Sequence, residues 1–156
     1  GKVALCFQHN KFGVLMNEGD ILKSIEKTIT HDNIRQYAEV SGDFNPIHID
    51  EEFGKQSQFG KNIAHGMMIA ATISEIMLIN FGEVWQSSGK MKLRFKSPVY
   101  PNDTIKASGH VKKIIQTEKT NDIHCIVNIS SGETVAISCD SFISIPNNQE
   151  AICKKN

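Results

Sequence analysis

Residues 65–81 read HGMMIAATISEIMLINF, and this stretch decides the fold of the chain. His65-Gly66 and the apolar run after it predict a helix over residues 67–79 that is apolar on nearly all sides. The run is about 15 residues long and is interrupted by polar residues such as Ser74, whereas a bilayer span needs ~20 apolar residues. We therefore expect a buried helix, covered on most sides by other elements, and no membrane span.

The chain after this helix alternates between apolar and polar residues with a period of two, which is typical of β-strands. Met91, Leu93 and Phe95 fall on one face of the first such strand. We predict strands over residues 91–96, 105–112, 123–129 and 134–144, with turns at 98–103 and 121–122. An antiparallel sheet curved around the long helix would cover it, so the predicted fold class is α+β.

The segment before the long helix is predicted to contain a strand, two shorter helices and two loops. Thr30 can cap the first of these helices, and Gly42 and Pro46 favour a loop after it. The predicted order is a strand over 21–29, a helix over 30–40, a loop over 41–46, a short helix over 50–57 and a loop over 58–64.

The length of 156 residues suits one domain with a single hydrophobic core. We assign residues 20–146 to this domain, residues 1–19 to an N-terminal extension or short strand, and residues 147–156 to a polar tail. Seventeen basic residues balance seventeen acidic ones. This balance gives no indication of a nucleic-acid-binding or membrane-binding surface, since both usually need clustered positive charge.

The spacing of cysteines and histidines argues against a metal centre. The four cysteines form no CxxC pair, and none of the six histidines has a second ligand at zinc spacing. Cys125 and Cys139 lie on the two strands of a predicted hairpin, where we expect buried free thiols. With no secretory pattern in the first residues, the expected location is the cytoplasm, or the matrix of an organelle in a eukaryote.

The sequence SGDFNPIH, residues 41–48, places a carboxylate and an imidazole on one short loop. Asp43 and His48 could share the addition or removal of water, one group taking a proton from water while the other gives a proton to carbon. Alternatively, Asp43 only caps a turn and His48 only packs, because Asn45-Pro46 is common turn chemistry. Taken alone, the spacing leaves both interpretations open.

The sequence FGKNIAHGM, residues 59–67, leads into the long helix. A glycine at a helix start exposes backbone N–H groups at the positive end of the helix dipole, where negative charge on an oxygen is stabilised. In a thioester reaction, that oxygen is the carbonyl oxygen. Gly66 is therefore a candidate oxyanion donor, although a glycine needed only for close helix packing would give the same pattern.

Together the two sequences resemble the MaoC-like branch of the hot-dog superfamily, which includes (R)-specific enoyl-CoA hydratases. The resemblance is strongest over residues 34–79 and covers both blocks and their separation. It implies a hot-dog fold, in which a curved antiparallel sheet wraps around a long central helix. The predicted strands up to residue 145 are compatible with that fold.

The resemblance also implies roles for individual residues. Asp43 and His48 become the catalytic acid–base pair, Asn45 orients them or the water, and the Gly66 amide becomes the oxyanion donor. Ser74, Met77 and His65 become substrate-binding residues, the first two facing the acyl pocket. For Met77, ordinary core packing explains the residue equally well.

The implied activity is the reversible hydration of a trans-2-enoyl thioester, carried by coenzyme A or an acyl carrier protein, to the (R)-3-hydroxyacyl product. It needs no cofactor beyond the coenzyme A of the substrate, and such proteins usually form homodimers. Two other functions remain open, a hot-dog acyl-CoA thioesterase and a non-catalytic acyl-CoA-binding module. The lysines of the later strands are either solvated strand faces or a basic rim for the phosphates of coenzyme A.

Overall fold

The computed structural model describes residues 16–147, so most of the predicted extension over 1–19 and nearly all of the tail over 147–156 lie outside the described residues. The described chain forms, in order, β1 Ile25–Thr28, α1 His31–Ser41, α2 Pro46–Ile49, α3 Glu51–Gln56, α4 Gly66–Phe81, α5 Glu83–Ser88, β2 Lys90–Phe95, β3 Thr104–Gln116, β4 Thr120–Ser131 and β5 Thr134–Pro146.

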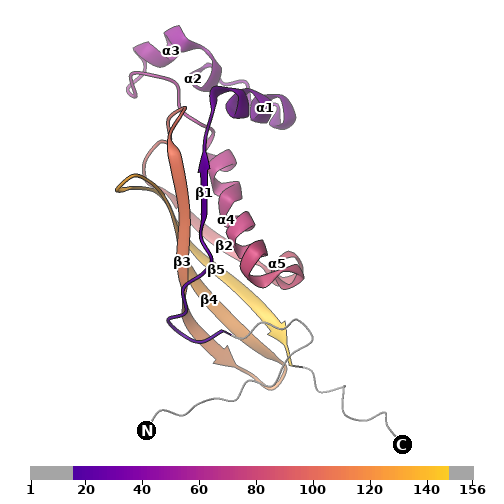
Figure 1. Ribbon diagram of the computed structural model, residues 1–156. Coiled ribbons are helices and arrows are strands. Elements are labelled where there is room, and N and C mark those ends of the chain that lie inside the picture. The colour runs from indigo at the N-terminus through magenta and orange to yellow at the C-terminus, as the bar shows by residue number, and fades with distance from the viewer. Residues whose placement is uncertain (1–15, 148–156) are drawn as a thin grey trace, which may run out of the picture.

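The five strands of the described residues form one antiparallel sheet in the order β1-β3-β4-β5-β2. The sheet curves along α4, and α1, α2 and α3 lie beyond one end of that helix (Figure 1). This arrangement confirms the α+β class and places the long apolar helix against the sheet, as its composition requires. Because β1 and β2 form the two edges, the strand before α4 and the strand after it lie at opposite edges of the sheet.

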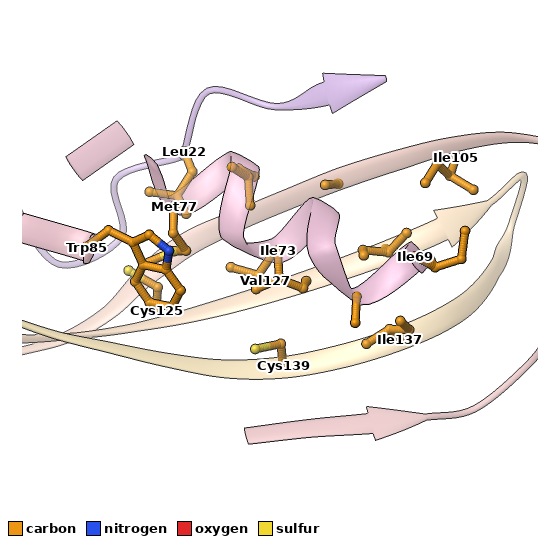
Figure 2. Close-up of a cluster of buried hydrophobic side chains, with 14 of the residues drawn as sticks. Leu22, Ile69, Ile73, Met77, Trp85, Ile105, Cys125, Val127, Ile137 and Cys139 are labelled. Carbon is orange, nitrogen blue, oxygen red and sulfur yellow. The ribbon is translucent and has the colours of Figure 1, made fainter. Parts of the chain in front are cut away.

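The core lies between α4 and the inward face of the sheet (Figure 2). Ile69, Ile73 and Met77 of α4 are at most 2% exposed. Cys125 and Cys139 are buried free thiols, as predicted, and desolvation raises the pKa of Cys125 to about 12. Within residues 16–147, no helix combines the length and the apolar character that crossing a bilayer requires.

Three details of the local predictions were wrong. The strand predicted over 21–29 is regular only in β1, because the Lys23 backbone bonds to the Asn80 side chain instead of to a strand. The turn predicted at 121–122 lies earlier, since the Thr117 hydroxyl accepts from the backbone N–H of Thr120 and so closes the turn before β4 begins. The short helices α2 and α5 were not predicted.

Candidate active site

Asp43 lies directly after α1, on the loop that the sequence predicted. Thr30 caps the start of α1 as predicted, in a capping box with Asn33. Gly42 ends the helix in the left-handed conformation, at φ 78°, which glycine adopts without steric cost. The Asp43 carboxylate accepts from the Asn45 backbone N–H at 3.2 Å, and its side chain is 52% exposed.

His48 lies on α2, the one-turn helix that starts where a loop was predicted. The Asn45 side chain accepts from the Ile47 backbone N–H and caps this helix, and Pro46 occupies its first position. Nδ1 of His48 lies 2.8 Å from the carbonyl oxygen of Ile63. Because a carbonyl can only accept, Nδ1 carries the proton and Nε2 carries the lone pair.

The lone pair of His48 faces the carboxylate of Asp43. The distance from Nε2 to Oδ2 of Asp43 is 3.9 Å, too long for a direct hydrogen bond and suitable for a water between the two groups. Desolvation by burial lowers the pKa of His48 below its usual 6.5, against the raising effects of the Ile63 carbonyl and of Asp43. The imidazole is therefore neutral near pH 7 and can accept a proton.

His65 contacts both Asp43 and His48. Its Nε2 donates to the backbone carbonyl oxygen of Asp43 at 2.9 Å, and its ring stacks on His48 with centroids 3.8 Å apart. The ring of Tyr37 in α1 also packs against the His65 ring, in a tilted arrangement with the ring centroids 4.8 Å apart. His65 is 2% exposed, so it can reach substrate only through the residues that it supports.

Asn62 is a site residue that the sequence reasoning missed. Its buried side chain donates to the carbonyl oxygens of Ile47 and Asp50, and so joins the end of α2 to the start of α3. It also lies so close to Gly54 that a Cβ there would collide with it. Asn62 belongs to the quoted block 59–67, so the resemblance had covered it without indicating its role.

Gly66 begins α4 and lines a cavity of about 360 Å³ beside His48. A Cβ at Gly66 would come within 3.1 Å of the Phe95 ring, so this glycine is packed closely against β2. The N-cap residue His65 makes no side-chain cap, which leaves N–H groups of the first turn without a side-chain partner. Besides these residues, the cavity wall includes Ile63, Ile69, Val99 and Ile137.

Ser74 and Met77, the two residues expected at the acyl pocket, do not line this cavity. The Ser74 hydroxyl accepts a hydrogen bond from Nε1 of Trp85 at 2.9 Å. Met77 is fully buried in the core. Both lie deeper along α4 than the cavity extends.

Asp43, His48 and His65 also form a cluster of possible metal ligands, with one ligand atom of each within 4.8 Å of the others. The geometry of this cluster is poor for an ion. The two imidazole rings are stacked, with their planes 29° apart, and do not face a common point edge-on as ligands of one ion usually do. Nδ1 of His48 and Nε2 of His65 already bond to backbone carbonyls. A site without metal stays our prediction.

The lysines of the later strands are exposed and spread over several surfaces. Only Lys96 of this set lines the cavity beside His48, whereas Lys90 and Lys113 line a separate groove at the other end of the sheet. The remaining members of the set, Lys92, Lys106 and Lys112, are also exposed. Most of them are therefore solvated strand faces, and a basic rim at the cavity would rest on Lys96.

Comparisons with known proteins identify the family of the chain. The family model described as "MaoC like domain" matches residues 16–132. The chain is 28% identical to a 3-hydroxybutyryl-CoA dehydratase of Methylorubrum extorquens, over 86% of this chain and 84% of that protein. It is 33% identical to a mitochondrial 3-hydroxyacyl-[acyl-carrier-protein] dehydratase of Arabidopsis thaliana, over 85% and 80% of the two chains.

Solved structures give the same fold. The MaoC-like dehydratase from Rhodospirillum rubrum superposes with a TM-score of 0.71 at 20% identity, and the match covers 85% of this chain and 94% of that one. The predicted hot-dog fold is thus confirmed, with α4 as its central helix. The family match covers most of the described residues, and the chain belongs to the MaoC-like family of hydratases and dehydratases.

Proposed function

We propose that this enzyme catalyses the reversible hydration of trans-2-enoyl thioesters to (R)-3-hydroxyacyl thioesters. The observation that carries the proposal is the gap of 3.9 Å between the Asp43 carboxylate and Nε2 of His48, next to the cavity that begins at Gly66. Relatives named as acting on coenzyme A and on acyl-carrier substrates fit a thioester of either kind. The substrate itself supplies coenzyme A, and we expect no other cofactor.

His48 has the protonation state that hydration needs, because burial lowers its pKa and leaves a neutral imidazole that can accept a proton. A water molecule between Asp43 and His48 transfers one proton to the pair while its oxygen bonds to C3 of the enoyl group. The pair then delivers that proton to C2, so one water is added and no proton is left over. Because the same pair serves both steps, hydroxyl and hydrogen add to the same face of the double bond.

Gly66 stabilises the negative charge that develops on the thioester oxygen in this reaction. Attack at C3 makes the carbonyl oxygen enolate-like, and the Gly66 amide at the positive end of α4 donates to it. Loss of one such donor costs on the order of 3–4 kcal/mol of transition-state stabilisation in other enzymes. Asn45 contributes by capping α2 and by bonding to Asp43, which fixes the separation of the pair.

The test compares Asp43→Asn and His48→Gln with the unaltered enzyme on enoyl-CoA substrates of four to sixteen carbons. Each change should reduce kcat by about 10²-fold or more, with the fold intact by circular dichroism, because each removes one proton carrier. Near-normal turnover in either purified variant would show that the pair is not the acid–base machinery.

The same assay distinguishes the other functions. Hydration is followed as loss of the enoyl absorbance and thioester hydrolysis as release of free thiol. Thiol release without loss of unsaturation would identify a thioesterase. Tight binding of acyl-CoA with no turnover at any chain length would identify a binding module.

The edge strand β2 makes a homodimer the expected assembly. β2 is the last strand of the sheet, and its side chains Met91 and Phe95 are 42% and 55% exposed. An unpaired edge with exposed apolar side chains favours pairing with a second sheet. Phe95 also lines the cavity, so pairing there would cover the thioester site. The cytoplasm or an organelle matrix stays the predicted location.

A further inference from the structure

Three aromatic side chains form a row beside the Asp43–His48 pair. Tyr37 of α1 packs against the ring of His65, which directly precedes α4, with the ring centroids 4.8 Å apart. His65 in turn stacks on His48 of α2, with the ring centroids 3.8 Å apart. Aromatic rings in contact prefer particular relative orientations. The orientation of the His48 ring therefore depends on a row of contacts that begins at Tyr37.

The same row also reaches Asp43. The helix α1, which carries Tyr37, ends at Ser41, and Asp43 follows two residues later. Between them Gly42 has a φ of 78°, and glycine restrains the direction of the chain less than any other residue. His65 supplies a restraint instead, because its Nε2 donates to the Asp43 carbonyl oxygen at 2.9 Å. One buried ring thus contacts both members of the pair, and Tyr37 packs on that ring.

Tyr37 also lines a groove of about 600 Å³ between α1 and α4. Met68 and Thr72 of α4 form part of the same groove, whereas His65 is only 2% exposed. A smaller side chain at position 37 would connect the groove to His65 and admit water toward His48. Because desolvation is the largest of the causes that lower the pKa of His48, added water would raise that pKa.

Two titratable groups of residues 16–147 face His48, namely Asp43 on the loop after α1 and His65 at the start of α4. The Ile63 carbonyl oxygen holds Nδ1 of the same ring. Tyr37 is not one of the residues that line the cavity beside His48. Its influence on the Asp43–His48 pair therefore passes through His65.

We propose that Tyr37 is a positioning residue of the hydration reaction, and that its ring holds His65 where His65 fixes both Asp43 and His48. This inference rests on the proposed hydratase function and adds to it a residue that does not contact the substrate. The ring of Tyr37 carries the role, and its hydroxyl is not needed, since the contact with His65 is between the two rings.

The first experiment compares Tyr37→Leu, which removes the ring, with Tyr37→Phe, which keeps it. In Tyr37→Leu we expect kcat to fall about tenfold or more, because a small misplacement of the reacting groups is costly. KM should change little, since Tyr37 does not line the cavity. In Tyr37→Phe both constants should stay close to those of the unaltered enzyme. Equal losses of kcat in the two variants, or no loss in either, overturn the inference.

The matched control is Phe142→Leu, which removes another ring from a histidine. Phe142 stacks on His124 with the ring centroids 4.4 Å apart, and both residues line the groove at the other end of the sheet. This variant should keep the kcat of the unaltered enzyme. A loss as large as that of Tyr37→Leu would show a general weakening of the fold and would contradict the inference. If circular dichroism shows that Tyr37→Leu is unfolded, Tyr37→Met takes its place, because the flexible methionine side chain fills irregular space without a ring.

The second experiment is an NMR titration of His48, which needs no turnover and so separates this inference from the proposed function. In Tyr37→Leu the pKa of His48 should rise toward the ordinary 6.5, whereas Tyr37→Phe and Phe142→Leu should leave it lowered. An unchanged pKa of His48 in Tyr37→Leu overturns the inference, whatever the enzyme hydrates. Failure of the unaltered enzyme to hydrate any enoyl thioester overturns the proposed function instead.

Discussion

At the scale of single residues, the proposed chemistry of the site depends on His48 being neutral. Burial lowers the pKa of its imidazole below 6.5, and His65 adds to this lowering, while the Ile63 carbonyl and Asp43 oppose it. The unfolded chain therefore binds a proton at His48 near pH 6.5, whereas the folded chain does so only at lower pH. The stability that comes from a neutral His48 is present above pH 6.5 and is lost as the pH falls through the lowered pKa.

The pH dependence of activity should follow the same group. We expect the acid limb of kcat/KM, which reports the free enzyme, to give an apparent pKa below 6.5. Kinetics between about pH 4.5 and 8, together with an NMR titration of the histidines, would measure it. His110→Gln, which changes an exposed histidine of β3, is the control and should leave the limb in place. An acid limb above pH 6.5 would contradict the assignment to His48.

The side chain of His65 includes a polar atom that lowers the stability of the folded protein. Its Nδ1 is buried and has no hydrogen-bond partner among residues 16–147. Leaving such a group unpaired costs roughly 1–3 kcal/mol, and unpaired groups of this kind are rare in native structures. Other contacts of the same ring offset this loss of stability, since it donates to the Asp43 carbonyl and stacks on His48.

His65→Phe should separate these effects, because it keeps a stacked ring and removes both the donor and the unpaired nitrogen. We expect kcat to fall about tenfold or more, since the Asp43 loop loses its anchor. The acid limb should move to higher pH, since His65 no longer lowers the pKa of His48. The melting temperature should hold or rise. If the variant had an unchanged kcat and an unchanged acid limb, His65 would contribute only by packing.

At the scale of elements, the position of His48 depends on the junction between α2 and α3. Both helices are short, at four and six residues, and neither would be stable alone. Caps and one buried amide hold them: Asn45 caps α2, Asp50 caps α3, and Asn62 bonds to the carbonyls at their junction.

Asn62→Ala should therefore affect both stability and activity. It removes two buried hydrogen bonds, so we expect the free energy of unfolding to fall by about 1–3 kcal/mol and kcat to fall with it. The matched control is Asn80→Ala, which also removes an amide that donates to two backbone carbonyls but lies far from the cavity. Urea denaturation and kinetics on both variants would test this. If the control loses as much kcat, the junction has no specific role.

At the scale of the whole molecule, the proposed homodimer depends on the exposed edge of β2. Met91→Glu places a charge on that edge, and we expect light scattering to show a change from two chains to one. Because Phe95 of the same strand lines the cavity, kcat/KM should fall as well. Ile115→Glu, which places the same charge on an exposed apolar position of β3, away from β2, is the control. A monomeric unaltered protein with full activity would contradict the dimer.

The parts of the site that could be predicted are those encoded by local chemistry. Gly42 and Asn45 set the turn at Asp43, and Gly66 starts the long helix, because glycine conformation, side-chain caps and helix starts depend on neighbours in the sequence. The α2 helix was missed since a four-residue helix has no periodicity to detect. The partner of Ser74 could not be predicted for a different reason, since its hydroxyl accepts from Trp85, eleven residues later on another helix.

The sequence by itself determined the class of fold, the central helix and the two blocks that carry Asp43, His48 and Gly66. These follow from periodicity, turn residues and resemblance, which are properties of short segments. Only the tertiary structure decided the tautomer of His48, the anchoring roles of His65 and Asn62, and the depth of the cavity. Each of these depends on contacts between segments distant in the chain, and such contacts form only when α4 and the sheet close around one core.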